Sequence, residues 1–321
     1  MIMRVGQNPA KSVDFVAQPE KVTVAIVSYI PTLGGYYAQS LEVLKACLGS
    51  IWENTQTPYD LLVFDNASCP EVCAYLSEIH AQGKIQYLVL SEKNIGKAGA
   101  WNFIFGAAPG EYVAYADSDV YHFPGWLEPQ IELLEAFPQA GMVTGMPMWT
   151  PAEYSTATAA WIEQHPELEL ERGKFLSWDD YWRHARSLGA DEAKAQAHFA
   201  SVEELTMLYL GQRYYIGAAH FQFVARKAAL QSVLPIPSER PMGQVRLLDI
   251  ALNERGYLRF CTPDWWVQHM GNTLQEEFKP QGTESHTKPA KRGSAKIWGF
   301  KPVRKIVNWL YHRTFEILYR D

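Results

Sequence analysis

Four apolar segments that read as buried strands follow one another in the first third of the chain, and they constrain the fold more than any other feature. They are VTVAIVSY (22–29), YDLLVFDNAS (59–68), KIQYLVL (84–90) and EYVAYA (111–116). Continuous apolar runs rich in β-branched residues are typical of strands that are buried on both faces. Helical patterns fill the intervening segments, at 40–55, 70–83 and 98–108. Strands that alternate with helices predict an α/β fold, in which a mostly parallel sheet is flanked by helices.

Polar side chains follow three of these predicted strands at the point where each strand ends. Asp65 ends the second strand, Asn94 follows the third, and Asp117 and Asp119 end the fourth. One such residue would be read as a turn former. Because ligands bind beyond the carboxyl ends of the strands in open α/β sheets, three clusters at one sheet edge indicate a binding site.

The pair Asp117 and Asp119 suits a hard divalent cation. Two carboxylates this close repel each other unless a positive charge lies beside them, and Mg²⁺ or Mn²⁺ completes its ligand shell with water and substrate phosphates. An EF-hand is excluded, because Tyr121 and His122 stand where that loop needs Asp or Asn and then Gly. Capping of the following turn is the alternative, which the pair alone leaves open.

A set of segments in fixed order resembles the family 2 glycosyltransferases, which have the GT-A fold. The segments are VAIVSY, LLVFDNAS, NIGKAGAWN and EYVAYADSDV, followed by GAAHFQFVARKAAL, LLDIALNERGY and TPDWWVQH. The resemblance covers roughly residues 22–270, with an interruption at 150–215. It implies a GT-A fold with a Rossmann-like nucleotide-binding half. It also implies transfer of a sugar from a nucleotide-diphosphate sugar to an acceptor hydroxyl.

The resemblance also implies roles for individual residues. Those expected to bind the nucleotide sugar are Asp65, Asn94, Lys97, Asp117 and Ser118. Asp119 and His269 are expected to hold Mn²⁺ or Mg²⁺, which stabilises the diphosphate leaving group. For His269, a structural histidine within the sheet is an equally weighted alternative.

Asp249 matches the catalytic base of the family. An inverting transfer needs a base that takes the proton of the acceptor hydroxyl. The family often has Glu-Asp at this point, whereas this chain has Leu248-Asp249, so any role of the Glu is left unassigned. Without the resemblance, Asp249 would be read as an exposed helical residue. Retaining enzymes share the fold and the acid pair, so the stereochemistry stays open.

Residues 150–215 interrupt the α/β pattern. They are acidic and rich in Trp and Tyr, and SVEELTMLYLGQRYY has a helix-like composition, so we expect a helical insertion. Trp178 and Trp182 offer apolar faces to an acceptor sugar, with packing inside the insertion as the alternative. The predicted organisation is an N-terminal arm (1–20), a nucleotide-sugar-binding half (21–149), the insertion (150–215), an acceptor and catalytic half (216–278), and a basic linker with a C-terminal amphipathic helix (279–321).

Charge and composition limit the partners and the location. The net charge of −6 gives no reason to expect nucleic acid. Without an apolar signal core or a run of 18 apolar residues, we expect a cytoplasmic protein whose four cysteines are free thiols. The basic, aromatic tail is compatible with peripheral contact with an anionic membrane, near a lipid-linked acceptor. A tail that docks on its own domain is the alternative.

Two other function classes are weighed against glycosyl transfer. A sugar nucleotidyltransferase needs a Gly-rich loop with Arg after the first strand, whereas IPTLGGYYAQS (30–40) has neither Arg nor Lys. A non-catalytic carbohydrate-binding protein would not need acids at one sheet edge. Processive synthases of the family carry Gln-x-x-Arg-Trp and membrane spans, and since neither appears in this sequence we expect single addition.

Overall fold

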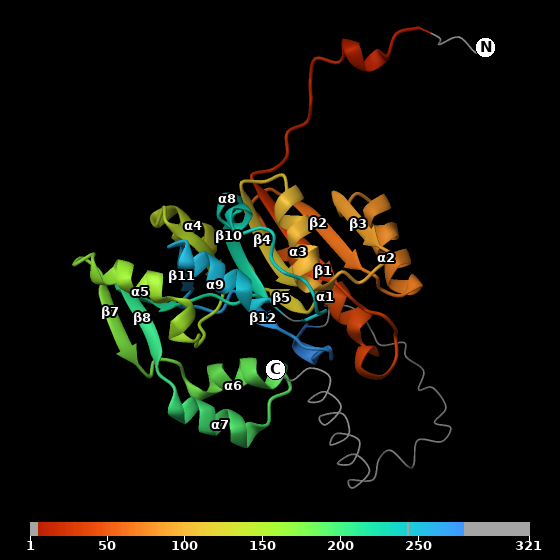
Figure 1. The fold of residues 1–321 in the computed structure, drawn as a ribbon. Helices are drawn as coiled ribbons and strands as arrows, with labels where there is room; N and C mark the ends of the chain where they lie inside the picture. Colours follow the sequence, from red (N-terminus) through yellow and green to blue (C-terminus); the bar gives the residue numbers. More distant parts are fainter. Residues whose placement is uncertain (1–5, 243, 279–321) are drawn as a thin grey trace, which may run out of the picture. The chain divides into compact units, whose positions relative to one another are not determined.

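The computed structural model describes residues 6–242 and 244–278 (Figure 1). The basic linker and the amphipathic helix predicted at 279–321 therefore lie outside the described residues. Residues 6–20 are exposed and contain one short 3₁₀ helix, η1 (Pro9–Ser12). All four cysteines are free, as expected. In the described part of the chain, we find no helix with the length and apolar character needed to cross a bilayer.

Ten strands form one mixed sheet in the order β3-β2-β1-β4-β10-β6-β11-β9-β8-β7. Their bounds are β1 (Val22–Ser28), β2 (Tyr59–Asn66), β3 (Tyr87–Ser91), β4 (Tyr112–Asp117), β6 (Ala140–Thr144), β7 (Glu169–Gly173), β8 (Glu204–Tyr209), β9 (Gln212–Ile216), β10 (Gln222–Arg226) and β11 (Leu258–Cys261). Strands β3, β2, β1 and β4 are parallel neighbours, and β11 is parallel to β6. Strand β10 runs antiparallel between β4 and β6, and β9, β8 and β7 extend the sheet in antiparallel fashion. The expected α/β class is confirmed, and the arrangement is GT-A-like.

Helices cover both faces of this sheet (Figure 1). The helices are α1 (Ser40–Asn54), α2 (Pro70–Ala81), α3 (Gly96–Ala107), α4 (Glu128–Ala136), α5 (Thr156–Glu163), α6 (Trp178–Ser187), α7 (Glu192–Ser201), α8 (Lys227–Ser232) and α9 (Arg246–Glu254). Helices α1, α2 and α4 share one buried cluster, and α3, α8 and α9 share the other.

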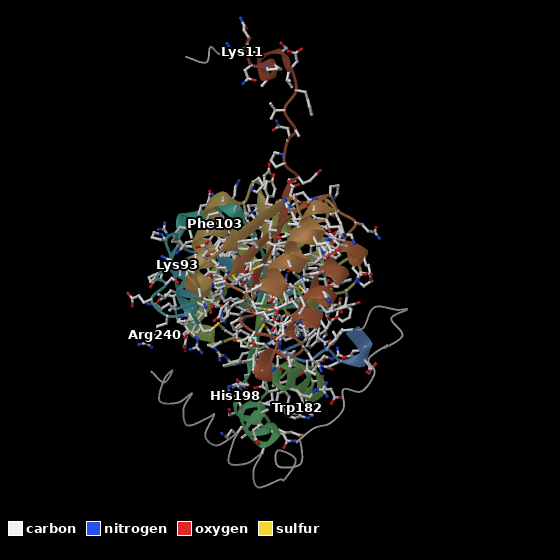
Figure 2. The ribbon with its side chains drawn as sticks, turned by 90° about the vertical axis from the view of Figure 1, so that its right-hand side faces the viewer. Lys11, Lys93, Phe103, Trp182, His198 and Arg240 are labelled. Atoms are coloured by element: carbon white, nitrogen blue, oxygen red, sulfur yellow. The ribbon has the colours of Figure 1, made fainter. Side chains whose placement is uncertain are left out.

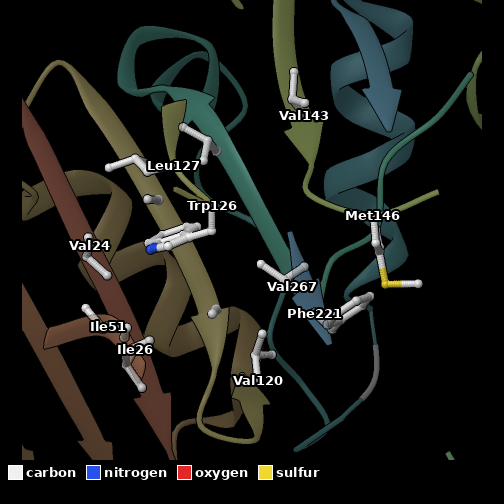
Figure 3. Packing of buried hydrophobic residues seen from close by; sticks show 14 of the residues in the cluster. Val24, Ile26, Ile51, Val120, Trp126, Leu127, Val143, Met146, Phe221 and Val267 are labelled. Atoms are coloured by element: carbon white, nitrogen blue, oxygen red, sulfur yellow. The ribbon is translucent and has the colours of Figure 1, made fainter. Parts of the chain in front are cut away.

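Strand β1 shows why two cores form. Its successive side chains point to opposite faces, so Val24 and Ile26 enter the first cluster while Ala25 and Val27 enter the second. Figure 3 shows Val24 and Ile26 in the first cluster, together with Trp126 from the loop before α4. Every residue of β1 is buried, which explains the continuous apolar run in its sequence.

The expectation of a helical SVEELTMLYLGQRYY is wrong, because this segment forms the hairpin of β8 and β9. Tyr209 pairs with Gln212 across a two-residue turn. Leu210 and Gly211 in that turn have φ of 50° and 77°, which is the geometry that favours a tight hairpin. Pairing with β7 on one side and β11 on the other completes the ladder. The insertion therefore contains three strands besides its helices.

A separate two-stranded sheet joins β5 (Val120–His122) to β12 (Val267–His269). The two strands are antiparallel, and His269 is paired with Val120. This pairing brings the segment that follows β4 close to the end of β12, although the two are far apart in the sequence.

Candidate functional site

Asp65 lies at the carboxyl end of β2 and is fully buried. The hydroxyl of Ser28, at the end of the neighbouring strand, donates to its Oδ2 at 2.7 Å. The backbone N–H of Ser68 donates to its Oδ1 at 2.9 Å, closing a turn in which Ala67 has a φ of 72°. Both oxygens are therefore held in place, and Asp65 fixes the shape of the edge after β1 and β2.

Asn94 connects this edge to the start of α3. Its side-chain oxygen accepts hydrogen bonds from Asn66 Nδ2 at 3.0 Å and from the backbone N–H of Gly96 at 2.8 Å. Gly96 has a φ of +76°, and a Cβ there would lie 2.7 Å from Ser238 Oγ, so glycine is needed. Asn94, which is predicted to bind the nucleotide sugar, thus lies where three segments pack tightly together.

Lys97 and Asp117 form an ion pair just below this loop. Lys97 is 8% exposed, and its Nζ donates to Asp117 Oδ2 at 2.6 Å. The hydroxyl of Tyr115 donates to Asp117 Oδ1 at 2.5 Å. Burial, and secondarily the Asp117 carboxylate, raises the pKa of Tyr115 well above its usual value, so this hydroxyl stays a donor. Ser118 follows in the turn between β4 and β5.

Asp119 and His269 are brought together by the pairing of β5 with β12. His269 Nε2 lies 3.2 Å from Asp119 Oδ2, while Oδ1 is buried and has no hydrogen-bond partner among the described residues. Burial opposes the charged form of each, but their mutual attraction is stronger. It lowers the pKa of Asp119 and raises the pKa of His269. The two side chains thus attract each other, and one carboxylate oxygen of Asp119 is left without a partner in the described part of the chain.

These two side chains fit a Mg²⁺ or Mn²⁺ ion that is shared with a substrate. Such ions are bound through one or two carboxylates together with substrate phosphates, and an imidazole suits Mn²⁺. A buried carboxylate oxygen without a partner is costly in the protein alone, and a cation would satisfy it. In residues 6–242 and 244–278, no three His, Cys, Asp or Glu side chains form a complete metal site, so a substrate would have to supply further ligands.

Ser187, at the end of α6, fixes the ring of His269. Its hydroxyl donates its single hydrogen to the backbone oxygen of His184 at 2.7 Å. It therefore accepts the 3.0 Å hydrogen bond from His269 Nδ1, which must carry a hydrogen. Nε2 is the nitrogen left to face Asp119. This is the arrangement in which a second contact orients a metal-binding histidine.

A cavity of about 400 Å³ lies between the insertion and α9. The insertion contributes Tyr181 and His184 from α6 and His198 from α7. The other residues that line the cavity include His220, Arg246, Asp249, Met148 and Trp149. Burial, and secondarily His269, lowers the pKa of His184 to about 4, so this ring is neutral near pH 7.

Asp249 lines this cavity and is 4% exposed. Its Oδ1 accepts a hydrogen bond at 2.5 Å from Arg259, a residue of β11 that is itself 1% exposed. Its Oδ2 lies 3.3 Å from Nδ1 of His220. The residue expected to be the base therefore has a partner on each oxygen.

Trp178 and Trp182 are not among the residues that line the cavity. Their rings stack at 5.7 Å, and Trp178 also packs against Phe199 of α7. Figure 2 shows Trp182 on α6 and His198 on α7. The aromatic residue of α6 that lines the cavity is Tyr181.

His220, Arg259 and Ser187 were not anticipated by the sequence analysis. Arg259 carries a signal, since an Arg inside the apolar strand LRFC must find a buried partner. His220 lies within the segment GAAHFQFVARKAAL, but nothing local to it indicates contact with Asp249. Ser187 carries no signal, because its role depends on how α6 packs against β12.

The mixed sheet and the polar groups at its strand ends define an α/β, GT-A-like protein. The sequence model described as "Glycosyl transferase family 2" matches residues 30–190, half of the chain. The chain therefore belongs to glycosyl transferase family 2 and is a glycosyltransferase, which confirms the resemblance and the enzyme class. This assignment decides against the nucleotidyltransferase and the non-catalytic binding protein.

Two solved structures are similar at the level of the fold. They are crystal structures of S. aureus TarS 1–349, one alone and one in complex with UDP. Each is 14% identical, with a TM-score of 0.45, and the alignment covers 77% of this chain. It spans 59% of the length of each TarS chain. Comparison with curated proteins found no match.

Proposed function

We propose that this protein transfers a single sugar, with inversion, from a nucleotide-diphosphate sugar to a hydroxyl of a carbohydrate or a lipid-linked acceptor. The observation that carries the proposal is the buried, unpartnered Oδ1 of Asp119 beside His269. It lies next to the Lys97–Asp117 pair at the strand ends, in a chain whose family transfers glycosyl groups.

The donor lies on the side of residues 21–149, over the ends of β1, β2 and β4. Asp65 and Asn94 shape the edge that receives the nucleoside, and Asp117 and Ser118 follow on the neighbouring strand end. Lys97 has three N–H donors and uses one for Asp117. The other two are available to oxygen atoms of the diphosphate. UDP is the first nucleotide to test, because it is bound in one of the similar structures.

Asp119 and His269 hold Mn²⁺ or Mg²⁺ in this proposal. When bound, the ion acts as a Lewis acid that stabilises the charge developing on the diphosphate. The residues themselves provide one free carboxylate oxygen and one imidazole nitrogen whose orientation Ser187 fixes.

The acceptor occupies the cavity between the insertion and residues 216–278, with its reacting hydroxyl at the end that holds Asp249. Tyr181 and Trp149, which line the cavity, then take the contact role that the sequence predicts for Trp178 and Trp182. Aromatic rings are suited to the apolar face of a sugar. Inversion requires that the proton acceptor and the leaving group lie on opposite sides of the transferred sugar.

A thermal-shift screen with UDP-, GDP- and dTDP-sugars, each with and without Mn²⁺, tests the donor side. A ligand present at 100 times its Kd stabilises the folded state by about 2.7 kcal/mol. We expect stabilisation that needs both nucleotide and metal, and we expect Asp119→Asn to remove the metal requirement or the binding. NMR of the product anomer with the donor that binds tests inversion. No response to any donor with metal would contradict the proposal.

A further inference from the structure

Arg246 lines the same cavity as Asp249, from the first turn of α9. It is exposed, and it stands three positions before Asp249 in the sequence. Residues three apart on a helix are neighbours on one face, with Cβ atoms about 5–6 Å apart. The guanidinium of Arg246 is therefore close to the part of the cavity where an acceptor hydroxyl would meet Asp249.

Helix α9 is held so that this face stays turned toward the cavity. On its other side, Leu248 is fully buried in the second core cluster. Asn253 stands four positions after Asp249, on the same face, and its Oδ1 accepts a hydrogen bond from the backbone N–H of Ala157 at 2.9 Å. Because these contacts fix the rotation of the helix, they also fix the position from which Arg246 extends.

The other charged groups that line the cavity have partners within the protein. Oδ1 of Asp249 accepts a hydrogen bond from Arg259 at 2.5 Å, so these two charges offset each other. Oδ2 of Asp180 accepts a hydrogen bond from the hydroxyl of Ser177 at 2.6 Å, at the start of α6. Among the described residues, no carboxylate forms an ion pair with Arg246.

The histidine rings of the cavity do not supply a free positive charge in its place. His220 lies against Asp249, and Nδ1 of His198 lies 2.7 Å from the hydroxyl of Tyr181. Burial lowers the pKa of His184 to about 4, so that ring is neutral near pH 7. The guanidinium at the start of α9 is thus the charged group of this cavity that the described residues leave without a partner.

The guanidinium lies on the acceptor side of the candidate site. The residues assigned to the donor and the metal, Lys97, Asp117, Asp119 and His269, are not among those that line the cavity. A cation in the first turn of a helix is also opposed by the helix dipole, so this charge does not stabilise α9. A bound anion would offset that cost.

We infer that the acceptor carries an oxyanion, either a carboxylate or a phosphate, beside its reacting hydroxyl and that Arg246 binds this group. The inference rests on the proposed function. The planar guanidinium presents N–H donors in a fork that matches two oxygens of either anion. Because Arg246 and Asp249 are neighbours on one helix face, the anion belongs to the sugar that is glycosylated or to the linkage next to it. The acceptor class is therefore an acidic sugar or a sugar phosphate.

Arg246 determines specificity in this reading and takes no part in the proton transfer. Its charge offsets the repulsion that the carboxylate of Asp249 exerts on an anionic acceptor. A hydrogen bond to a charged group contributes enough to change affinity by about 10- to 100-fold. The effect is expected in KM for charged acceptors, because the contact is the same before and during the reaction.

The test uses matched sets of methyl hexosides, methyl hexuronides and hexose 6-phosphates in the gluco, galacto and manno series. The assay is sugar transfer from the donor found in the thermal-shift screen, and the measured quantity is the ratio of kcat/KM for charged over neutral acceptors. We expect a ratio of about ten or more in wild type and a ratio near one in Arg246→Gln. The more active charged set identifies the anion as a carboxylate or a phosphate.

Arg255→Gln is the matched control, because Arg255 is an exposed arginine at the other end of α9 and does not line the cavity. It should keep the wild-type ratio. Arg246→Lys keeps the charge but loses the fork, so it should give an intermediate ratio. A second readout needs no turnover: with UDP and Mn²⁺ present, the charged compounds should raise the melting temperature of wild type and of Arg255→Gln, but not that of Arg246→Gln.

The inference is overturned if wild type uses the neutral acceptors as well as the charged ones, or if Arg246→Gln keeps the wild-type ratio. It is also overturned if the control loses the ratio to the same extent, or if no charged compound is either transferred to or bound. In each of these cases, donor binding that requires the metal leaves the proposed function standing. A wild-type protein that binds no donor with metal would overturn the proposed function and this inference together.

Discussion

Replacement of Arg259 by Met tests whether the wall behind Asp249 is as rigid as the structure shows. Arg259 donates to Asp249, and to the backbone oxygens of Tyr154 and Ala218, from a position that is 1% exposed. The substitution keeps the apolar stem but leaves a 4%-exposed carboxylate with His220 as its remaining side-chain partner. Breaking a buried ion pair from one side costs about 3–5 kcal/mol. With a cost of about 4 kcal/mol and an m-value of about 3 kcal/mol/M, the urea midpoint should fall by about 1.3 M.

The matched control is Lys45→Met, which removes an ion pair with Glu42 whose side chains are 39% and 58% exposed. Because solvent screens that pair, we expect a cost below about 1 kcal/mol. Adding Asp249→Asn to Arg259→Met should recover at least about 1 kcal/mol relative to additivity, since the unpaired charge is then gone. A cost for Arg259→Met no larger than that of the control, or strict additivity of the pair, would refute the reasoning.

Three other substitutions test neighbouring parts of the structure. Lys97→Met removes a hydrogen bond between charged groups, so the free energy of unfolding should fall by about 1.5–3 kcal/mol. The thermal shift induced by the nucleotide sugar should also disappear. Unchanged binding of the nucleotide sugar would exclude Lys97 from the site. Ser187→Ala should weaken metal-dependent nucleotide binding by about tenfold in calorimetry, while Ser201→Ala, which removes the same hydroxyl-to-backbone contact at the end of α7, should not. Burial lowers the pKa of His122 to about 3, against 6.5 for an ordinary histidine, so its contribution to stability is complete above pH 6.5 and is lost as the pH falls toward 3. Urea unfolding from pH 7.5 to 4.5 should show a slope up to about 1.4 kcal/mol per pH unit steeper in wild type than in His122→Gln, and equal slopes would contradict it.

The strands of the first half were predictable because burial on both faces leaves a mark in the sequence. β1, β2 and β4 carry continuous apolar runs, and the structure places them side by side in the sheet, between β3 and β10. β8 and β9 were not predictable in the same way. Their side chains are buried only in part, and only the short turn at Leu210 and Gly211 signals the hairpin. Composition alone therefore favoured a helix that tertiary pairing excludes.

The residues of the candidate site also differ in how far the sequence predicts them. Asp65, Asn94 and Asp117 stand at strand ends, so their common location follows from the sheet topology. The pairing of Asp119 with His269 depends on β5 and β12, two short strands that are far apart in the sequence, and it was expected only through the family resemblance. Arg259 and His220 contact Asp249 because three segments that are far apart in the sequence meet in the fold. No local sequence pattern indicates these contacts.

Helix α6 links the two halves of the candidate site. Ser187 at its end holds His269, while Tyr181 and His184 on the same helix line the cavity. The rings of α6 pack against Phe199 of α7 and against Phe221, so this helix connects the cavity to the end of β12. A ligand that fills the cavity would contact the helix that orients His269, so we expect its binding to be coupled to the geometry of the Asp119–His269 pair. The coupling must be reciprocal, so a metal and nucleotide bound at that pair should raise the affinity of the cavity for an acceptor by the same factor as the acceptor raises theirs.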